Sequence, residues 1–490
     1  MTGEIAIALL LISSGFGALL SLHSIPPSAR AWLAAPTGGA LYLLVSLVHV
    51  LLTRKLDPNV GLGVVALFGV IGTVVAITRK TADRRLLIWG GMALAVGVIT
   101  VVLARMIHLT RLTSDSLQYV AMSRNLQVSE AADQIGSFFG LERQVGLPSL
   151  HALSEFTDRQ YLASIGPIFG VSCIGLFVWL GWRVTRNMSS GRIWLVFTAA
   201  LVLVTSNRFI YDFFYINTHI QVATFLLIAV AGAWLALQTG QPAWAVPAGL
   251  ALSVTTLLRP EAPLVVAILL VALAVTSASF KTRWAMTIPA VSVVFLWYGV
   301  LLMQYVDPED TVVVLGNTIA VMAAALLTIL GGTMQLRRLV RHSGWLMLVG
   351  LALGLVVLGV SNPELLANSA IATSRNLVSD GMWLLTWPVV LALGIVALSV
   401  QRIPEGRFWT TSIIGFGVLW WLLPLLRGGP WRVGTGDSGN RILAHFLPVV
   451  MLFLVLAAVD KWPFARESLG SSREDGATET DTLSNTAAST

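Results

Sequence analysis

Asp115 lies in the longest polar stretch of the chain, residues 105–162, between two apolar segments. The stretch opens with Arg105, His108 and Arg111 ahead of this carboxylate. A carboxylate held near lipid headgroups can accept a proton from a reacting hydroxyl, and an arginine can bind a phosphate through two parallel hydrogen bonds. Ionisable groups in a membrane protein cost free energy that packing does not require, so we expect this stretch to contribute to a functional site.

Three further groups of polar residues lie next to other apolar segments. Each combines arginine or histidine with acidic or amide side chains, and an arginine at headgroup depth is well suited to hold a phosphate. Arg441 and His445 lie four residues apart and therefore share one face of the predicted last helix. The groups are Asn207, Arg208, Tyr211, Asp212, Asn217 and His219; Arg259 and Glu261; and Arg427, Arg432, Asp437, Asn440, Arg441 and His445.

Each group also has a purely structural interpretation. Asp115 can cap the N-terminus of a helix, with Gln118 three residues later as in a capping box. Arg259 and Glu261 can form a neutralised surface pair that contributes little to stability. Arg441 can reach lipid phosphate from the start of its helix, and the aromatic residues near 207–219 can anchor the chain at the membrane surface.

The fold class follows from composition. Of the 490 residues, 56% are hydrophobic and only 11% are charged, and the apolar runs of about twenty residues are long enough to cross a hydrocarbon core as helices. Runs such as 264–275 and 349–360 are apolar on all sides, which favours helices over the alternating strands of a membrane barrel. We predict an all-α polytopic membrane protein with about fifteen transmembrane helices and interfacial helices in an outer loop. The predicted spans are 4–22, 32–52, 59–77, 86–104, 163–182, 193–206, 219–237, 243–258, 262–278, 284–303, 311–330, 344–360, 381–400, 408–426 and 442–459.

Basic residues set the predicted sidedness. They gather in alternate loops, with Arg54 and Lys55 as an exception, and by the positive-inside rule those loops face the cytoplasm. The stretch 105–162 and the other polar groups then face outward, and the net charge of +7 reflects topology and not nucleic-acid binding. The basic clusters are Arg79, Lys80, Arg84 and Arg85; Arg183, Arg186 and Arg192; Lys281 and Arg283; Arg337, Arg338 and Arg341; Arg402 and Arg407; and Lys461 and Arg466.

Four regions follow from these features. Residues 1–85 are predicted to form extra N-terminal transmembrane helices, and residues 86–303 a catalytic transmembrane module that includes the outer loop 105–162. Residues 304–463 complete the transmembrane part. Residues 464–490 are rich in Ser, Thr, Glu and Asp, with too little apolar surface to fold, and are predicted to be a disordered cytoplasmic tail.

The placement of these groups resembles the GT-C superfamily of integral-membrane glycosyltransferases, which includes the protein O-mannosyltransferases and the aminoarabinose transferases. In that family an acidic residue follows a transmembrane helix in the first outer loop, as Asp115 does within Ser-Asp-Ser-Leu-Gln-Tyr119. The resemblance covers roughly residues 86–303 and the final hairpin. The other matching motifs are Asn217-Thr-His-Ile at the start of a span, Leu257-Leu-Arg-Pro-Glu261 at a basic turn, and Asn440-Arg-Ile-Leu-Ala-His445 at the late helix that contacts donor phosphate in the family.

The resemblance implies an inverting transfer of a sugar from a polyprenyl-phosphate donor to a hydroxyl of an unknown glycan, lipid or protein acceptor. The leaving phosphate is already a stable anion, so a single carboxylate suffices as base, whereas a glycosidase needs two carboxyl groups. Asp115 is the implied base, Arg259 and Arg441 the donor phosphate ligands, and Arg208 and His445 second choices. Further substrate-binding candidates are Tyr119, Asp212, His219, Glu261, Asp437 and Asn440.

The chain departs from the family pattern in two ways. Three extra spans precede the outer loop, and the motif at Asp115 has one acidic residue where many members have two, which bears on metal binding. We predict no cofactor and no obligatory metal, although the missing second acid leaves divalent-metal binding open. Arg105, His108 and Arg111 fit headgroup anchors better than catalysts. A lipid donor suits an outward site, so we expect a multi-pass protein of the bacterial plasma membrane with a cytoplasmic C-terminus.

Other classes of protein share some of these features. A membrane transporter or flippase places ionisable residues near the bilayer midplane and is commonly built from repeats, whereas here the predicted spans are nearly free of charge and show no repeat of fixed period. An O-antigen ligase or polymerase type enzyme also uses outer arginine and histidine, but its largest outer loop comes late in the chain. The third alternative is an inactive relative that binds lipid or acts as a scaffold.

Overall fold

The regular structure of the chain is helical. Within the described residues the pairing of extended backbone is limited to an isolated bridge between Arg111 and Tyr215. The prediction of an all-α fold is therefore confirmed, while the predicted disordered tail 464–490 lies outside the described residues. The computed structural model describes residues 1–79, 84–107, 110–128, 143–188, 191–304, 306, 308–333, 340–400, 403 and 405–460.

Fewer helices than predicted are long enough to span a membrane. Eleven helices of the described residues pass by length and composition, or twelve if α9 (Arg192–Thr205) and α10 (Asn207–Phe214), bent by 61°, form one span. The other three predicted spans coincide with apolar helices of only 10 to 17 residues. At about 1.5 Å per residue such helices reach about 15–26 Å, less than a hydrocarbon core of about 30 Å. The count of about fifteen is thus not confirmed. The short helices are Pro242–Thr255, Ala262–Ala274 and Thr386–Ser399.

Large apolar side chains cover the outside of the bundle. On α17 (Ser343–Ser361) the exposed fractions reach 68% at Leu346, 59% at Val356 and 76% at Val360. Apolar surface of this extent is unfavourable in water and favourable in contact with lipid. The protein is therefore an integral multi-pass membrane protein.

The first four long helices pack closely together. A Cβ on Gly15 would overlap the carbonyl oxygen of Ala34, and one on Gly38 would overlap that of Leu11, so the crossing of the first two helices requires glycine. Asp57 accepts a hydrogen bond from the backbone N–H of Asn59 and begins the third helix. These helices are α1 (Thr2–Leu19), α2 (Pro27–Thr53), α3 (Pro58–Thr78) and α4 (Arg84–Ile107).

The centre of the bundle is α11 (His219–Thr239), in which nearly every side chain is buried. It contacts helices from both ends of the chain, including the second and the last. Apolar residues on all its faces explain this position, since a helix without a polar face has no reason to lie at a surface. Its neighbours include α8 (Ile165–Val184), η3 (Pro242–Trp244), α12 (Ala245–Thr255) and α14 (Phe280–Val294). The same part of the chain also contains α13 (Ala262–Ala274), the π-helix η4 (Phe295–Leu301) and η5 (Leu302–Gln304).

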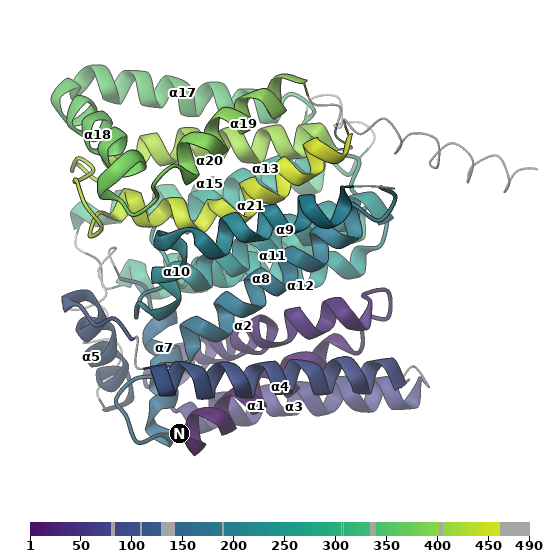
Figure 1. Cartoon of the computed structure of the whole chain (residues 1–490). Helices are drawn as coiled ribbons and strands as arrows, with labels where there is room; N and C mark the ends of the chain where they lie inside the picture. The colour runs from purple at the N-terminus through teal and green to yellow at the C-terminus, as the bar shows by residue number, and fades with distance from the viewer. Residues whose placement is uncertain are drawn as a thin grey trace, which may run out of the picture.

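The C-terminal part adds helices along one side of this centre (Figure 1). α13 packs against α15 (Pro308–Leu330) and α20 (Gly406–Leu426), and the last helix, α21 (Ser438–Asp460), packs against α11. The start of the last helix therefore meets the start of α11 although more than two hundred residues separate them. Besides α17, these helices are α15 (Pro308–Leu330), α18 (Pro363–Arg375), the π-helix η6 (Asn376–Asp380), α19 (Thr386–Val400), α20 (Gly406–Leu426) and α21 (Ser438–Asp460).

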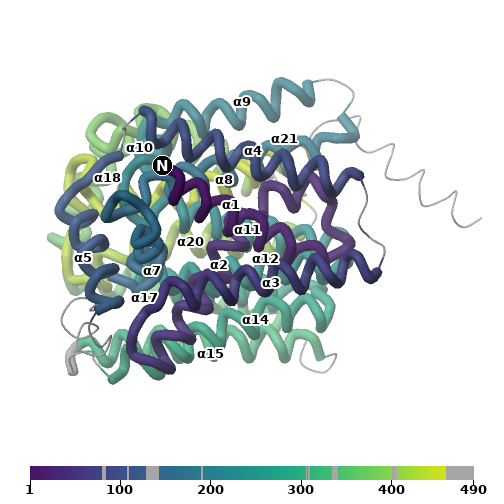
Figure 2. Tube along the Cα trace, turned by 90° about the horizontal axis from the view of Figure 1, so that it is seen from below, coloured from purple at the N-terminus to yellow at the C-terminus, as the bar shows by residue number. Residues whose placement is uncertain are grey.

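Short helices gather at one end of the bundle, the end at which the N-terminus lies. Figures 1 and 2 show α5 (Ser114–Val128), α7 (Gly146–Ala152) and α18 there. The stretch 105–162 thus contains helices, and η2 (Leu153–Phe156) follows α7, while their place at the membrane interface in an outer loop stays a prediction. Every residue of α7 is buried, so this helix packs inside the protein and does not lie free on its surface.

Candidate functional site

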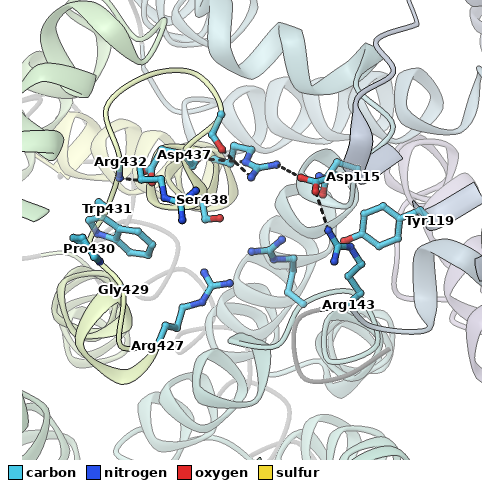
Figure 3. Close-up of a pocket in the computed structure, with 14 residues that line it drawn as sticks. Asp115, Tyr119, Arg143, Arg427, Gly429, Pro430, Trp431, Arg432, Asp437 and Ser438 are labelled. Atoms are coloured by element: carbon cyan, nitrogen blue, oxygen red, sulfur yellow. Dashed lines mark hydrogen bonds and ion pairs between the residues drawn. The ribbon is translucent and has the colours of Figure 1, made fainter. Parts of the chain in front are cut away.

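A polar cavity of about 440 Å³ opens at the end of the bundle that carries α5 and α7 (Figure 3). It is formed by segments that lie far apart in the sequence: α5, the segment that leads into α7, the segment before α11, the turn between α12 and α13, and the hairpin from the end of α20 to the start of α21. Its lining residues are Asp115, Tyr119, Arg143, Asn217, Arg259, Arg427, Gly429, Pro430, Trp431, Arg432, Gly436, Asp437, Ser438 and Arg441.

Asp115 faces this cavity between two arginines. Its Oδ1 accepts a hydrogen bond from Nη2 of Arg143 at 2.8 Å, and its Oδ2 accepts one from Nη1 of Arg441 at 3.2 Å (Figure 3). The helix cap is supplied instead by Thr113, whose Oγ1 accepts from the backbone N–H of Ser116 at 3.4 Å. The alternative interpretation of Asp115 as a helix cap is therefore wrong.

The two arginines also control the charge of this carboxyl. Partial burial raises the pKa of Asp115, but the hydrogen bonds and positive charges of Arg441 and Arg143 outweigh burial, so the pKa lies below its ordinary value. The group is thus an ionised carboxylate at neutral pH, able to accept hydrogen bonds and a proton but not to donate one.

The start of α5 is fastened to the segment that precedes α11. The backbone N–H of Arg111 donates to the carbonyl of Phe214 at 2.7 Å, and Oγ of Ser116 donates to the carbonyl of Ile216 at 2.9 Å. The hydroxyls of Thr113 and Tyr215 lie 3.1 Å apart, within hydrogen-bond distance. These bonds fix the first turn of α5 and hold the carboxylate of Asp115 opposite the last helix.

Arg441 is held in place by the first turn of α21 and the loop before it. Its Nη2 donates to the carbonyl of Gly436 at 2.9 Å and its Nε to that of Asp437 at 3.3 Å. A third contact joins its Nη1 to the hydroxyl of Tyr215 at 3.1 Å. The guanidinium therefore has a fixed orientation, as a preorganised anion ligand requires.

Asp437 lines the cavity but is engaged by the backbone. Its Oδ1 accepts from the N–H of Arg432 and its Oδ2 from the N–H of Asn440, each at 2.8 Å. Burial raises the pKa of Asp437 more than these bonds lower it. Asp437 thus caps α21 and closes the glycine-rich loop, which leaves Asp115 as the better placed carboxylate for chemistry.

Arg259 and Glu261 form a buried ion pair beneath the cavity. Nε of Arg259 lies 2.9 Å from Oε1 of Glu261, and the two residues are only 7% and 6% exposed. The interpretation as a surface pair is wrong, because the turn between α12 and α13 is covered by other elements. The terminal Nη groups of Arg259 have no hydrogen-bond partner among the described residues, and the side chain lines the cavity.

The cavity carries an excess of positive charge. Among the described residues that line it, five are arginines and two are aspartates. Arg427 stands across from Asp115 with its guanidinium toward the centre (Figure 3). A concave wall in which guanidinium groups outnumber carboxylates raises the local concentration of anions and suits phosphate, which binds two arginine donors at once.

Several predicted site residues lie behind the cavity wall. Arg208 donates to Asp212 at 3.1 Å and to the carbonyl of Thr435 at 2.7 Å, so it supports the glycine-rich loop. Nδ1 of His219 and Nε2 of His445 lie 2.8 Å apart in a buried pair. None of these four side chains lines the cavity, which places the second-choice ligands Arg208 and His445 one layer away from it.

Asn440 also belongs to this supporting layer. Its side-chain oxygen accepts from Nε1 of Trp383, and its Nδ2 donates to the carbonyl of Gly381 at 3.0 Å. These bonds join α21 to the segment before α19. Of the predicted residues, the structure brings Asp115, Tyr119, Arg259, Asp437 and Arg441 together in the lining, with Glu261 directly beneath.

Sequence reasoning missed part of the lining, most importantly Arg143. This arginine lies in the same polar stretch as Asp115, 28 residues later, and the spacing alone does not pair them. Arg427 and Arg432 belong to the glycine-rich group but were not singled out as ligands. Their signal was available, because a charged residue that ends an apolar span lies at headgroup depth.

The prediction that Arg105 is a headgroup anchor is wrong. Arg105 is buried, and its guanidinium pairs with Glu4 and with Asp158, each at 2.9 Å, so it is part of the protein core and not a headgroup anchor. His108, expected to play the same part, lies outside the described residues. Arg111 contributes backbone bonds to the segment before α11.

Metal ligands do not cluster in the part of the chain that is described. No three His, Cys, Asp or Glu side chains gather there in a metal-binding arrangement. The donor set of the cavity itself, five guanidinium groups against two carboxylates, is unfavourable for a divalent cation. The absence of an obligatory metal stays a prediction.

Fold and site together define a class: a helical multi-pass membrane protein with a cationic cavity at one end of its bundle. Comparison of the chain with protein-family models, curated proteins and solved structures gives no match. The resemblance to the GT-C superfamily therefore rests on the residues of this chain alone.

Proposed function

We propose that this protein is a membrane glycosyltransferase that moves a sugar from a polyprenyl-phosphate donor to an acceptor hydroxyl, with inversion at the anomeric carbon. The observation that carries the proposal is the position of Asp115, an ionised carboxylate on the wall of a cavity in which arginines are in excess. That pairing supplies a proton acceptor beside an anion site, which is what displacement of a phosphate by a hydroxyl needs.

The donor phosphate binds between the arginines of the cavity. Arg259 offers two Nη groups that have no hydrogen-bond partner in the described part of the chain, and Arg441 is oriented by its own helix start. Arg427 approaches from the opposite wall (Figure 3). Phosphate oxygens gain charge as the bond to the sugar breaks, so these guanidinium groups stabilise the transition state more than the bound donor.

A second, more apolar groove of about 460 Å³ adjoins this cavity and supports a lipid-linked donor. It runs between α13, α15 and α20, and Glu261 and Arg427 border it. Leu264, Val313 and Leu423 form part of its apolar wall. A donor with its phosphate beside Arg427 can lay the first isoprene units of its chain in this groove.

The reaction needs one proton transfer and one displacement. The acceptor hydroxyl gives its proton to Asp115 while its oxygen forms a bond to the anomeric carbon. The bond from that carbon to the phosphate oxygen breaks, and the phosphate leaves with the electron pair. Arg143 and Arg441 reduce the basicity of Asp115. We expect the donor phosphate to take over these two arginines and thereby restore that basicity.

The cavity faces outward in this proposal. Basic residues of the opposite end, such as Arg183, Arg186 and Arg407, then face the cytoplasm in accordance with the positive-inside rule. The lipid carrier brings the sugar to the outer face, where soluble nucleotide sugars are absent. This assignment also places the C-terminus in the cytoplasm.

The test is transfer by the purified protein with a panel of polyprenyl-phosphate hexoses and pentoses, measured as release of polyprenyl phosphate. Asp115→Asn should lower kcat by about 10²–10⁴-fold, the usual contribution of a general base. Glu364→Gln is the matched control, because Glu364 is an exposed acid at the start of α18 at the same end of the bundle. Full activity of Asp115→Asn would remove Asp115 as the base.

A second measurement separates transfer from transport. Vesicles that contain the protein and a fluorescent polyprenyl phosphate report whether the lipid changes leaflets. Lipid translocation without any sugar transfer, unaffected by Asp115→Asn, would replace the proposal with a flippase. A strong effect of Asp115→Asn on product release with no effect on translocation supports the enzyme.

A further inference from the structure

A separate cavity with a basic lining lies at the end of the bundle opposite the candidate active site. Its volume is about 400 Å³, and α13, α17 and α20 enclose it. α20 connects the two cavities: Gly406 begins the helix at this one and Arg427 follows its end at the candidate active site. Its 21 residues span about 31 Å at 1.5 Å each. The lining residues are Val275, Arg341, His342, Gly344, Trp345, Leu348, Gly406, Arg407, Thr410 and Thr411.

Two helices begin side by side at this cavity. Among the described residues, no side chain caps the N-terminus of α17, after His342, or of α20, after Glu405. A Cβ on Gly344 would lie only 3.0 Å from Oγ1 of Thr411, which shows how closely the two starts approach. The uncapped N–H groups of both first turns therefore place partial positive charge around the same space.

The side chains of the lining add full charges and an unsatisfied donor. Arg341 and Arg407 are exposed, and their side chains have no hydrogen-bond or ion-pair partner among the described residues. Thr411 is only 5% exposed, yet its hydroxyl has no hydrogen-bond partner there either, and it lines the cavity. A hydroxyl that lines a cavity and makes no bond to the described residues is available to donate to a ligand there, so this arrangement points to a bound ligand with acceptor oxygens.

We propose that this cavity binds the phosphate headgroup of an anionic phospholipid in the leaflet opposite the candidate active site. The phosphate lies between the two helix starts and accepts hydrogen bonds from Arg341, Arg407 and Thr411. Two features favour a lipid over a soluble phosphate. Trp345, 66% exposed, stands at the rim as an interfacial anchor would, and Leu348 continues the lining toward the apolar surface.

The test is native mass spectrometry of the full-length protein in detergent, titrated with phosphatidylglycerol and, in parallel, with phosphatidylcholine. The wild type should retain phosphatidylglycerol preferentially. The double variant Arg341→Gln/Arg407→Gln should bind it about 25-fold more weakly, at about five-fold for each arginine. The matched control is Arg186→Gln/Lys281→Gln, which removes two exposed charges that do not line the cavity.

Thr411→Val tests the same cavity without a change of charge and should weaken phosphatidylglycerol binding about ten-fold, since the bond to a charged phosphate is lost. Equal losses in the double variant and its control would mean unspecific attraction to the basic end and would overturn the proposal. Undiminished binding in both the double variant and Thr411→Val would overturn it too. A third arm uses glycerol 3-phosphate: if it displaces phosphatidylglycerol at equal concentration, the site takes soluble phosphates and the lipid assignment is wrong.

Discussion

Two clusters of charge at the same end of this protein are built on opposite principles. The Arg105 cluster, formed by Glu4, Arg105, Asp158 and Ser164, joins α1 and α4 to the chain before α8. Arg105 pairs with both carboxylates at 2.9 Å, and Glu4 also accepts from the backbone N–H and the hydroxyl of Ser164 at 3.1 and 2.6 Å. The cavity around Asp115 has five arginines for two aspartates.

The comparison shows how one polar stretch serves two purposes. Both clusters take side chains from residues 105–162, yet the first satisfies its charges within the protein and the second does not. A buried charge that finds its partner inside the fold holds segments together, whereas charge that remains unbalanced around a cavity is available to a ligand. The difference yields three predictions, in order of decreasing effect.

The largest effect is expected from Arg105→Gln. This change leaves Glu4, whose side chain is 0% exposed, without its charged partner in the interior. We expect unfolding to become easier by about 3–5 kcal/mol, the usual cost of removing one partner of a buried pair. Thermal unfolding in detergent measures it, with Asp158→Asn as control, because the side chain of Asp158 is 60% exposed. An unchanged midpoint for Arg105→Gln would contradict a structural role for this cluster.

Arg259→Lys should have a smaller effect and on a different quantity. Lysine keeps the charge opposite Glu261 but loses the two parallel donors that arginine presents to a phosphate. We expect the donor KM to rise about ten-fold with little change in the unfolding midpoint. The same replacement in the other cluster, Arg105→Lys, is the matched control and should lower the midpoint but not change KM. If both variants change the same quantity, the distinction between the clusters fails.

The smallest effect concerns pH. Asp115 acts as a base only when ionised, and its pKa is lowered from 3.8 by the two arginines that outweigh burial. Activity should therefore fall only as the pH drops through that lowered pKa. The stability that these ion pairs contribute is fully present above the ordinary pKa of an aspartate and is lost as the pH falls through the lowered pKa of Asp115. Arg143→Gln should move the acid limb of kcat/KM to higher pH. An unmoved limb would mean that another group controls it.

Much of the fold could be predicted because its signals are local. Runs of apolar residues and the prolines at helix starts reveal where helices lie, and all fifteen predicted segments coincide with helical structure. The predicted number of spans is not confirmed, since hydropathy does not show that the apolar helices around Arg259 have only 10 to 17 residues. The length of a helix also depends on whether the surrounding elements accommodate a turn at its end. Here they accommodate the turn that contains Pro260 and Glu261.

The candidate site was predicted in outline only. Asp115, Arg259 and Arg441 could be selected because each follows or starts an apolar segment with the same predicted sidedness. Arg208 and His445 have the same sequence signal but lie behind the cavity wall, and Arg143 has a weaker signal but touches Asp115. Residue type and predicted sidedness do not determine whether a side chain at the start of a helix points into the cavity or lies behind its wall.

The helical membrane fold, with polar residues gathered toward one predicted side, follows from the order of the residues alone, because hydropathy and charge act over a single turn or span. The contact of Asp115 with Arg441, 326 residues away, and the pairing of Arg105 with Glu4, 101 residues away, arise instead from the packing of distant segments. The first pairing depends on how α21 packs against α11, and the second on how α1 packs against α4. Charge balance, which separates a structural ion pair from a binding cavity, is a property of that packing and has no local pattern in the chain.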